Sequence, residues 1–260
     1  MQFVFPADPL NSKKLDSAFV SQAEALPQPY ALLSLEEDKL MNVIPGEILL
    51  YRGWMMNPGE YHSFSLLAER HGALMFTSVA QYLNTHHIPN WYPLLKEFTP
   101  ETYVIENSRL AECDLVAELN SLGWGTFFIK DYVKSLKTSR GAIITTAEEA
   151  PELVDMMGLY RGSIEGGLCV RKYEQFFDEK RFFIMKGQVF SSKPYSDLVG
   201  YMLREVSQRI DSPFFSVDIA YGSNGRPRVV ELGDGQVSGL VGSWTPELLS
   251  DMFKKGGIDG

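Results

Sequence analysis

The sequence predicts a mixed α/β (α+β) protein: an N-terminal α/β domain followed by a second domain rich in antiparallel hairpins. In the first hundred residues, short apolar runs alternate with helical patterns, which is typical of an α/β unit. After residue 108, apolar strands joined by tight turns dominate. The chain has 260 residues, 45% hydrophobic and 22% charged, which is long enough for two domains with their own cores. We expect an N-terminal domain at residues 1–107 and a second domain at 108–260.

The N-terminal domain is expected to alternate strands and helices. The predicted strands are the apolar runs at residues 3–5, 47–53 and 73–76. One helix is predicted to begin at Asn11 or Ser12 with Leu15, Phe19 and Ala23 along its apolar face. Two others are predicted from capping residues, one opened by Asn57, Pro58 and Glu60 and ending at Gly72, the other opened by Ser78. The Pro-rich stretch 88–102 is interpreted as a connector.

The second domain is expected to begin with one helix over residues 108–122, ended by Gly123. Further helices are predicted from the capping box of Thr146 and Glu149, and over residues 196–210. The predicted strands are the apolar runs at residues 124–129, 142–146 and 167–173, a hairpin that turns at Lys186-Gly187, and a last hairpin that turns at 222–225.

Charge and cysteine content exclude several classes of function. The chain has 24 Lys and Arg against 33 Asp and Glu, a formal net charge of -9, so we expect no nucleic-acid binding. The stretch 130–140 is a local exception, since it carries four basic residues and one acid, and it suits a small polyphosphate. Two cysteines without a Cys/His cluster predict neither a disulfide framework nor a zinc site. Without a bilayer-length apolar run or a signal peptide, we expect a cytoplasmic protein that does not contact the membrane.

Acids among apolar residues mark the last predicted hairpin. Asp218 lies on its first strand and Glu231 on its second, with Asp234 just beyond. A buried carboxylate needs a cation, either a basic side chain or a metal. Three converging carboxylates would suit Mg²⁺ bridging to nucleotide phosphates. The alternative, about equally favoured, is that Asp218 pairs with Arg226 or Arg228 and that Asp234 caps a turn.

Three basic residues stand at or near predicted strand ends, namely Lys130, Lys172 and Arg181. Each alone is more often a surface residue whose aliphatic stem covers apolar atoms. Their order is more informative. A strand-end lysine, a loop with Ser139 and Gly141, a cationic strand and an acidic hairpin together predict a nucleotide held between two sheets, with the loop over its phosphates.

From about residue 108 to 243, this order resembles the ATP-grasp superfamily of carboxylate-amine ligases. In that family a strand lysine contacts the nucleotide phosphates and a flexible loop covers them. A Glu and an Arg on the following strands contact ribose and γ-phosphate, and a D...ExN signature holds magnesium. The positions of this sequence that match are Lys130, the loop 135–141, Glu179, Arg181, Asp218 and Glu231.

The resemblance implies ATP and Mg²⁺ as cofactors and an ATP-grasp fold in which two antiparallel sheets hold the nucleotide. Residues 167–173 would contact adenine, mainly through backbone atoms. The residues expected to contact the nucleotide are Lys130, Ser139, Arg140, Val170, Arg171, Lys172, Tyr173, Glu179 and Arg181. The residues expected to hold the metal are Asp218, Glu231 and Asp234.

Two positions depart from the family pattern. The metal-binding Asn of the signature is Gly233 here, so Asp234 is taken as its substitute, and the usual Glu of the adenine hinge is Arg171. The first hundred residues are similar to the preceding domain of an uncharacterised bacterial and phage branch of the superfamily. The strings that carry this similarity are FPADPLNSKKLD, LYRGWM and HHIPNWYP.

Other candidate residues lie in the N-terminal domain. Arg52 follows an apolar strand at a position that lines the ligand crevice of open α/β sheets, so we expect it to clamp a substrate carboxylate. The alternative is a surface Arg paired with a nearby Glu. His86 or His87, beside Trp91 and Tyr92, is a candidate for substrate contact, although a structural role is favoured.

The predicted function is an ATP- and Mg²⁺-dependent ligase that forms an amide bond through an acyl phosphate. Its substrates would be small-molecule or peptide carboxylates and amines, its catalytic residues Arg181, Lys130 and Arg52, and an oligomer is compatible with the sequence. GxSxG, HRD, DFG, KxDG and GxxxxGK[ST] strings do not occur, which disfavours hydrolases, protein kinases, lysine-adenylating ligases and P-loop enzymes. The alternatives are a non-catalytic ATP-binding sensor or interaction protein, and phosphoryl transfer to an alcohol or amine without ligation.

Overall fold

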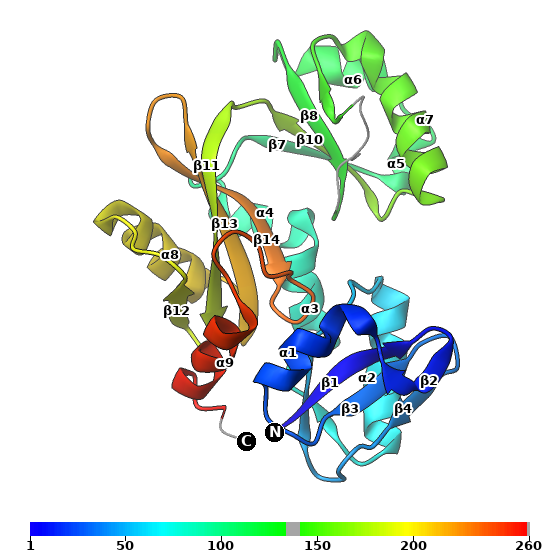
Figure 1. Cartoon of the computed structure of the whole chain (residues 1–260). Helices are drawn as coiled ribbons and strands as arrows, with labels where there is room; N and C mark the ends of the chain where they lie inside the picture. The colour runs from blue at the N-terminus through cyan, green and yellow to red at the C-terminus, as the bar shows by residue number, and fades with distance from the viewer. Residues whose placement is uncertain (134–140, 259–260) are drawn as a thin grey trace. The chain divides into compact units, whose positions relative to one another are not determined.

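The computed structural model describes residues 1–133 and 141–258, and its helices and three sheets confirm the predicted mixed α/β class (Figure 1). The chain forms two compact units. Unit 1 comprises residues 1–85, 180–218 and 231–260, and unit 2 comprises residues 86–179 and 219–230. The expected domain boundary at residue 107 stays a prediction. Among the described helices, none is both long and apolar enough to cross a membrane.

A mainly parallel sheet begins unit 1. Its strand order is β4-β3-β1-β5-β6, and β2 pairs only with β1. The strands are β1 (Gln2–Asp8), β2 (Asn11–Leu15), β3 (Ala31–Ser34), β4 (Lys39–Met41), β5 (Ile48–Tyr51) and β6 (Leu74–Met75). Residues 2–7 of β1 are all buried, as expected for a central parallel strand covered on both faces.

The helices of this part follow their local signals. They are η1 (Ser17–Phe19), α1 (Val20–Ala25), α2 (Pro58–Arg70) and α3 (Val79–His86). Asn57 and Glu60 form the predicted capping box of α2, since each side chain accepts a hydrogen bond from the other residue's N–H, at 2.9 and 2.7 Å.

The helix predicted from Asn11 is wrong. The Asp8 side chain accepts hydrogen bonds from the N–H groups of Leu10 and Asn11, which turns the chain back on itself. Residues 11–15 therefore form β2, antiparallel to β1, and helical structure begins only after Asp16. Leu15 thus belongs to a strand, while Phe19 and Ala23 remain on the helical segment and join the core of unit 1.

Antiparallel hairpins form a four-stranded sheet in the order β12-β11-β13-β14. The strands are β11 (Phe176–Met185), β12 (Gln188–Ser191), β13 (Phe214–Gly222) and β14 (Pro227–Asp234), and the helices are α8 (Asp197–Arg209) and α9 (Pro246–Lys255). Lys186 and Gly187 both have positive φ, 47° and 79°, in the predicted tight turn between β11 and β12. Phe183, Phe214, Trp244 and Phe253 pack together in the core of unit 1.

Unit 2 contains an antiparallel sheet in the order β7-β10-β8-β9. Its strands are β7 (Thr102–Glu106), β8 (Phe127–Asp131), β9 (Ile143–Ile144) and β10 (Gly167–Lys172). The helices are α4 (Ile88–Leu95), α5 (Asn107–Leu110), α6 (Leu115–Ser121), η2 (Ala147–Glu149) and α7 (Ala150–Arg161). Leu119 of α6 and Leu153 of α7 pack with Ile129 and Leu168 of the sheet, so both helices cover it (Figure 1).

Two helix predictions in unit 2 are wrong. Residues 88–95, expected to be part of a connector, form α4, because Pro89 occupies its first turn and Ile88, Trp91 and Leu95 are buried along one face. The helix expected over 108–122 is two helices. Asp114 breaks it by accepting a hydrogen bond from the Ala117 N–H at 3.1 Å, which makes it the N-cap of α6.

Candidate active site

A two-point ion pair joins Arg181 of β11 to Asp218 of the adjacent strand β13. Arg181 donates from Nε to Asp218 Oδ1 at 2.8 Å and from Nη2 to Oδ2 at 2.6 Å. The Asp218 side chain is 3% exposed and that of Arg181 15%, so the pair is largely removed from water. Parallel N–H···O bonds of this kind fix the plane of the guanidinium as well as its position. The partner of Asp218 is thus Arg181, whereas Arg228 pairs with Glu174 at 2.7 Å.

Glu231 and Asp218 face the same side of the hairpin. Gly235 donates its N–H to the Phe214 carbonyl, and this register sets Ser216 opposite Gly233 and Asp218 opposite Glu231. Residues two apart on a strand share a face. A Cβ atom at Gly233 would lie 3.2 Å from Ser216 Oγ, which agrees with that register. The hairpin therefore brings two of the three predicted metal ligands together.

Gly233 lies against a pair of serine hydroxyls. Ser216 Oγ and Ser238 Oγ are 2.7 Å apart, and Ser238 Oγ also donates to the Asp234 carbonyl at 2.8 Å. A Cβ at Gly233 would lie 3.0 Å from Ser238 Oγ, closer than almost all real contacts of that kind. The space beside Gly233 is occupied by these hydroxyls, and neither serine was singled out from the sequence.

Asp234, the third predicted metal ligand, points into the interior of unit 1. It is fully buried, and its Oδ1 accepts hydrogen bonds from the backbone and side-chain nitrogens of Gln236 at 3.0 and 3.1 Å. Its Oδ2 has no hydrogen-bond partner in the described structure. Burial raises the pKa of Asp234 to about 7, against the opposing effect of the Gln236 hydrogen bonds and the Arg52 charge. Asp234 caps a turn, as the alternative interpretation expected.

Arg52 lies inside unit 1 and is 2% exposed. Its guanidinium donates to the Gly235 and Ser238 carbonyls and, from Nε and Nη2, to Gln22 Oε1 of α1 at 3.2 and 3.0 Å. Burial lowers its pKa to about 10, and the charge of Arg181 lowers it further. Arg52 thus binds groups of its own chain, and a substrate carboxylate would have to replace these bonds.

Residues 235–239 form a turn after β14 that is held from two sides. Arg52 binds the carbonyls of Gly235 and Ser238, and Arg181 Nη1 donates to the Gly239 carbonyl at 3.0 Å. Gln236 accepts hydrogen bonds from the backbone of residues 51 and 53, at the end of β5. This segment, which we name the 235–239 turn, links the end of the parallel sheet to the Arg181 and Asp218 pair.

The predicted nucleotide contacts of unit 2 lie on or beside β8 and β10. Lys130 is 5% exposed and lies across from Cys169, whose pKa burial raises to about 12. Arg171 donates to the Val230 carbonyl at 2.6 Å and to Thr99 Oγ1, so it ties β10 to β14 within unit 2.

The remaining predicted nucleotide contacts differ in accessibility. Val170 is buried in the middle of β10, and the N–H groups of Lys172 and Tyr173 donate to the carbonyls of Glu101 and Thr126. Glu179 is exposed on β11. Ser139 and Arg140, with the rest of the predicted loop up to residue 140, lie outside the described residues. The nucleotide contacts of all these residues stay predictions.

Unit 2 also holds a His and Glu pair that the sequence did not indicate. His87 Nε2 lies 2.8 Å from Glu165 Oε1, and its ring stands edge-on to Tyr132 at 5.7 Å. Asp131 Oδ1 accepts the Val133 N–H at 2.8 Å and Oδ2 the Glu165 N–H at 3.4 Å. Because Glu165 is 78 positions from His87, no local spacing signalled this contact. These bonds order the end of β8 and match the structural role favoured for His87.

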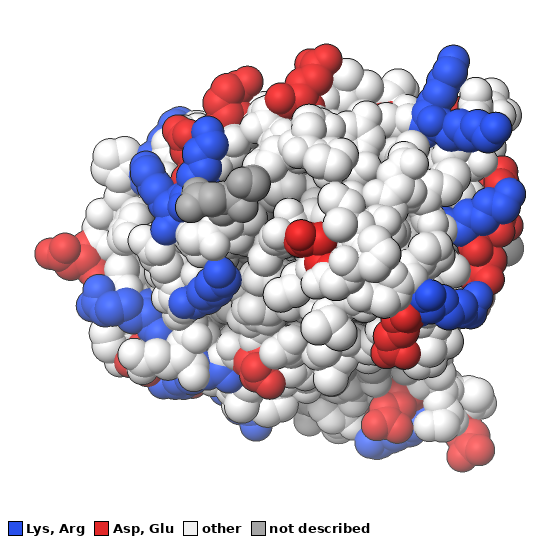
Figure 2. Space-filling view, turned by 90° about the horizontal axis from the view of Figure 1, so that it is seen from below, with Lys and Arg blue, Asp and Glu red and all other residues white. Residues whose placement is uncertain are grey.

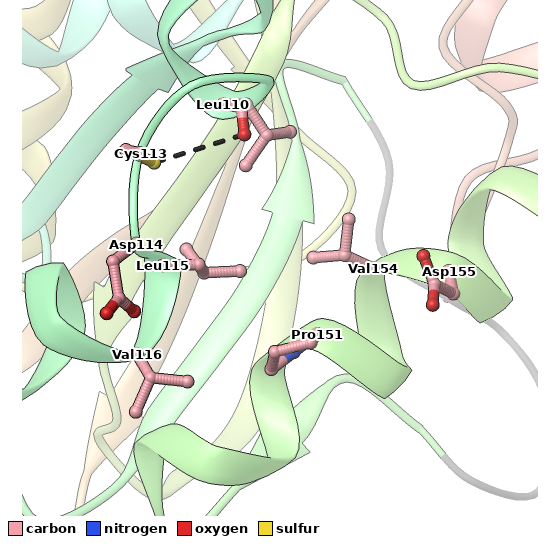
Figure 3. A pocket seen from close by; sticks show the side chains of 8 residues that line it. All are labelled: Leu110, Cys113, Asp114, Leu115, Val116, Pro151, Val154 and Asp155. Carbon is pink, nitrogen blue, oxygen red and sulfur yellow. Dashed lines mark hydrogen bonds between the residues drawn. The ribbon is translucent and has the colours of Figure 1, made fainter.

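A separate surface pocket of about 330 Å³ lies between the α5–α6 segment and α7 (Figure 3). Its lining consists of Leu110, Cys113, Asp114, Leu115, Val116, Pro151, Val154 and Asp155, and contains none of the predicted site residues. On the face drawn in Figure 2, leaving the grey residues aside, acidic and basic side chains are interspersed rather than gathered into a continuous basic surface.

Residues 110–252 match the model of an ATP-grasp domain family, the third family of its clade. The chain belongs to this ATP-grasp family. No curated protein matches the sequence.

Solved structures show the same fold. D-cycloserine synthetase DcsG has a TM-score of 0.65 at 14% identity, over 98% of this chain and 99% of that one. The D-alanyl-alanine synthetase A of Vibrio cholerae has a TM-score of 0.66 at 12% identity, over 98% and 97%. The ATP-grasp ligase PsnB, solved with a precursor variant, Mg and ADP, has a TM-score of 0.59 at 14% identity, over 98% and 96%.

Proposed function

We propose that this ATP-grasp protein is an ATP- and Mg²⁺-dependent ligase that joins a carboxylate to an amine through an acyl phosphate. The observation that carries the proposal is the set of Arg181, Asp218 and Glu231 on neighbouring strands, with Arg181 held in a two-point pair. An acyl phosphate forms when a carboxylate attacks the γ-phosphorus of ATP, and a cation fixed beside that phosphate stabilises the transferred charge. Family membership and ligases of the same fold support this assignment.

The acids of the hairpin fit a magnesium ion. Among the described residues, no group of three or more His, Cys, Asp or Glu side chains could hold a metal by itself. Mg²⁺ in nucleotide sites, however, typically binds one or two carboxylates and takes its other ligands from phosphate oxygens and water. Asp218 and Glu231 meet that requirement, and the bound ion would neutralise phosphate oxygens. Asp234 would support the site through the 235–239 turn, because its side chain faces Gln236.

The other site residues complete the proposal. We assign Lys130 and Lys172 to the phosphates, Glu179 to the ribose, and residues 170–173 to adenine, with Ser139 and Arg140 covering the phosphates. Arg52 would act through the 235–239 turn rather than on the substrate, because its guanidinium is already bound to Gln22 and to two carbonyls of that turn. The carboxylate and amine are a small molecule or a peptide.

The test is release of ADP from ATP and Mg²⁺ in the presence of pooled amino acids and short peptides, with mass spectrometry of the product. The informative variant is Glu231→Gln, which keeps the shape of the side chain and removes its charge. We expect kcat to fall by about 10² or more, as when a single electrostatic stabiliser is lost. Glu205→Gln on α8, which pairs with Arg209 away from the site, is the matched control and should keep wild-type kcat. Full turnover by Glu231→Gln would refute the metal assignment.

A second candidate is a nucleotide sensor that binds ATP without turnover. The crowding of Gly233 by the Ser216 and Ser238 hydroxyls favours it, because this position cannot offer a side-chain metal ligand without displacing them. The same assay separates the two functions. A sensor would bind ATP with Mg²⁺ tightly and release no ADP with any acceptor pool.

A further inference from the structure

Trp54 is an exposed indole held in a fixed orientation. Its side chain is 57% exposed, whereas Trp91 and Trp244 are buried and Trp124 is half-buried. Its Nε1 donates to Asp16 Oδ2 at 2.8 Å, and its ring stands edge-on to Phe19, with ring centroids 5.0 Å apart at 83°. An exposed aromatic ring that is already oriented loses little entropy when a ligand settles on it, so it makes an effective binding surface.

The indole lies where an open α/β sheet places its ligand. β3 pairs with one side of β1 and β5 with the other, and all three strands are parallel, so the chain order reverses at β1. Ligands of such sheets bind outside the carboxyl ends of the strands at this reversal. Asp16 donates its N–H to the Pro6 carbonyl near the end of β1, and Trp54 follows β5 by three residues. The Asp16 to Trp54 hydrogen bond therefore joins the two strand ends.

The chemistry of the pair favours a cation. Asp16 Oδ1 accepts the Ala18 N–H at 2.9 Å and Oδ2 accepts the indole N–H, and each carboxylate oxygen has a second lone pair. The face of an indole attracts ammonium groups more strongly than other aromatic rings do. A carboxylate at the edge of the ring and the π face above it can contact one ammonium group together.

We propose that Asp16 and Trp54 form a binding site for a positively charged ammonium group of the amine substrate. The inference rests on the proposed ligase function for the identity of the ligand, and it concerns binding only. The 235–239 turn connects this place to the candidate active site, since Gly53 donates its N–H to the Gln236 carbonyl at 3.1 Å and Arg181 binds the Gly239 carbonyl.

The test uses the full chain labelled with ¹⁵N-tryptophan, without ATP or Mg²⁺, and n-butylammonium at about pH 7 as the probe, so that the amine is charged. The Nε1–H resonance of Trp54 is assigned by its loss in Trp54→Phe. We expect n-butylammonium to shift this resonance saturably and to leave the resonances of the other tryptophans in place. Neutral n-butanol, of matched length, should not shift it at the same concentrations.

Asp16→Asn is the decisive variant, because its side chain still accepts the Ala18 N–H but carries no charge. Its affinity for n-butylammonium should fall by about tenfold or more, which corresponds to the loss of a charge-assisted hydrogen bond. Asp38→Asn removes an equal charge elsewhere in unit 1, at a residue whose φ of 49° suits Asn, and should bind as the wild type does.

Equal shifts with n-butanol, no shift with n-butylammonium, or unchanged affinity in Asp16→Asn would each overturn the inference. Because nucleotide is left out, these outcomes do not depend on ATP turnover. A ligase that turns over ATP but does not bind n-butylammonium would lose only this amine site, and a protein that binds n-butylammonium but releases no ADP would lose only the proposed ligase reaction.

Discussion

At the scale of single residues, the candidate site depends on how two carboxylates of one strand pair are treated differently. Asp218 faces Arg181 and is neutralised by two short hydrogen bonds. Asp234 is buried without a direct ion pair among the described contacts, and its pKa rises. One acid therefore stays ionised beside a cation, while the other holds a proton in the interior near neutral pH.

Asp218→Asn tests the pair. The amide keeps the shape of the side chain but removes the charge that compensates Arg181, so a largely buried guanidinium loses its counter-ion. Breaking a fully buried pair costs about 3 to 5 kcal/mol, and the partial exposure of Arg181 reduces this, so we expect a loss of about 2 kcal/mol. Urea denaturation measures it. Arg209→Gln, which breaks the pair with Glu205 on α8, is the control and should change the free energy of unfolding by about 0.5 kcal/mol or less.

Asp234→Asn tests the buried carboxyl through pH. Its pKa is about 7 in the folded chain, above the ordinary 3.8, so the folded state binds the extra proton between these values. The stabilisation from this proton is complete below about pH 4 and is lost as the pH rises through about 7. The wild type should thus lose stability relative to Asp234→Asn between about pH 4.5 and 7.5, as measured by thermal denaturation. A constant difference between the two proteins would contradict the raised pKa.

At the scale of elements, the 235–239 turn is the part of unit 1 on which most long-range hydrogen bonds of the site converge. It has no regular secondary structure to hold it, so side chains of distant elements supply its hydrogen bonds. Arg52 comes from the end of β5, Gln22 of α1 orients Arg52, and Arg181 comes from β11. The turn follows β14 directly, so its position sets the environment of Glu231.

Arg52→Lys should therefore loosen the turn. An ammonium group cannot reach two carbonyls and Gln22 in the planar geometry of a guanidinium. If Arg52 acts through the turn, kcat should fall about tenfold or more while the KM for the carboxylate substrate changes little, because a residue that positions other groups does not itself bind substrate. A selective rise of that KM would instead support the carboxylate clamp expected from the sequence.

At the scale of the whole molecule, the proposed nucleotide contacts belong to both units. Lys130, Lys172 and Glu179 lie in unit 2, and Arg181, Asp218 and Glu231 lie in unit 1. A ligand that binds residues of both units stabilises only the folded state in which both are formed.

ATP with Mg²⁺ should therefore raise the melting temperature of the chain in a dose-dependent way. Ligand at about 100 times its Kd adds about 2.7 kcal/mol of stability, which is several degrees for a chain of this size. Lys130→Ala in unit 2 and Glu231→Gln in unit 1 should each reduce the shift, as measured by scanning calorimetry. A shift that depends on only one of the two residues would place the nucleotide on a single unit.

Local signals in the sequence predicted the elements that local interactions control. The capping boxes of Asn57 with Glu60 and of Thr146 with Glu149, the N-cap Ser196 and the turn at Lys186-Gly187 all have the predicted structure. The failures lie where the pattern was ambiguous. Residues 11–15 became a strand because they pair with β1, and residues 88–95 became a helix because its apolar face is buried.

The sequence by itself determined the class of the fold, the acidic hairpin and the opposition of Asp218 and Glu231, because a short turn and the two-residue period of a strand leave little freedom. The tertiary structure alone decided the partners: Arg181 for Asp218, Gln22 and the 235–239 turn for Arg52, and the interior for Asp234. These contacts join residues from different elements, often far apart in the chain. They depend on how strands and helices pack, which no local spacing encodes.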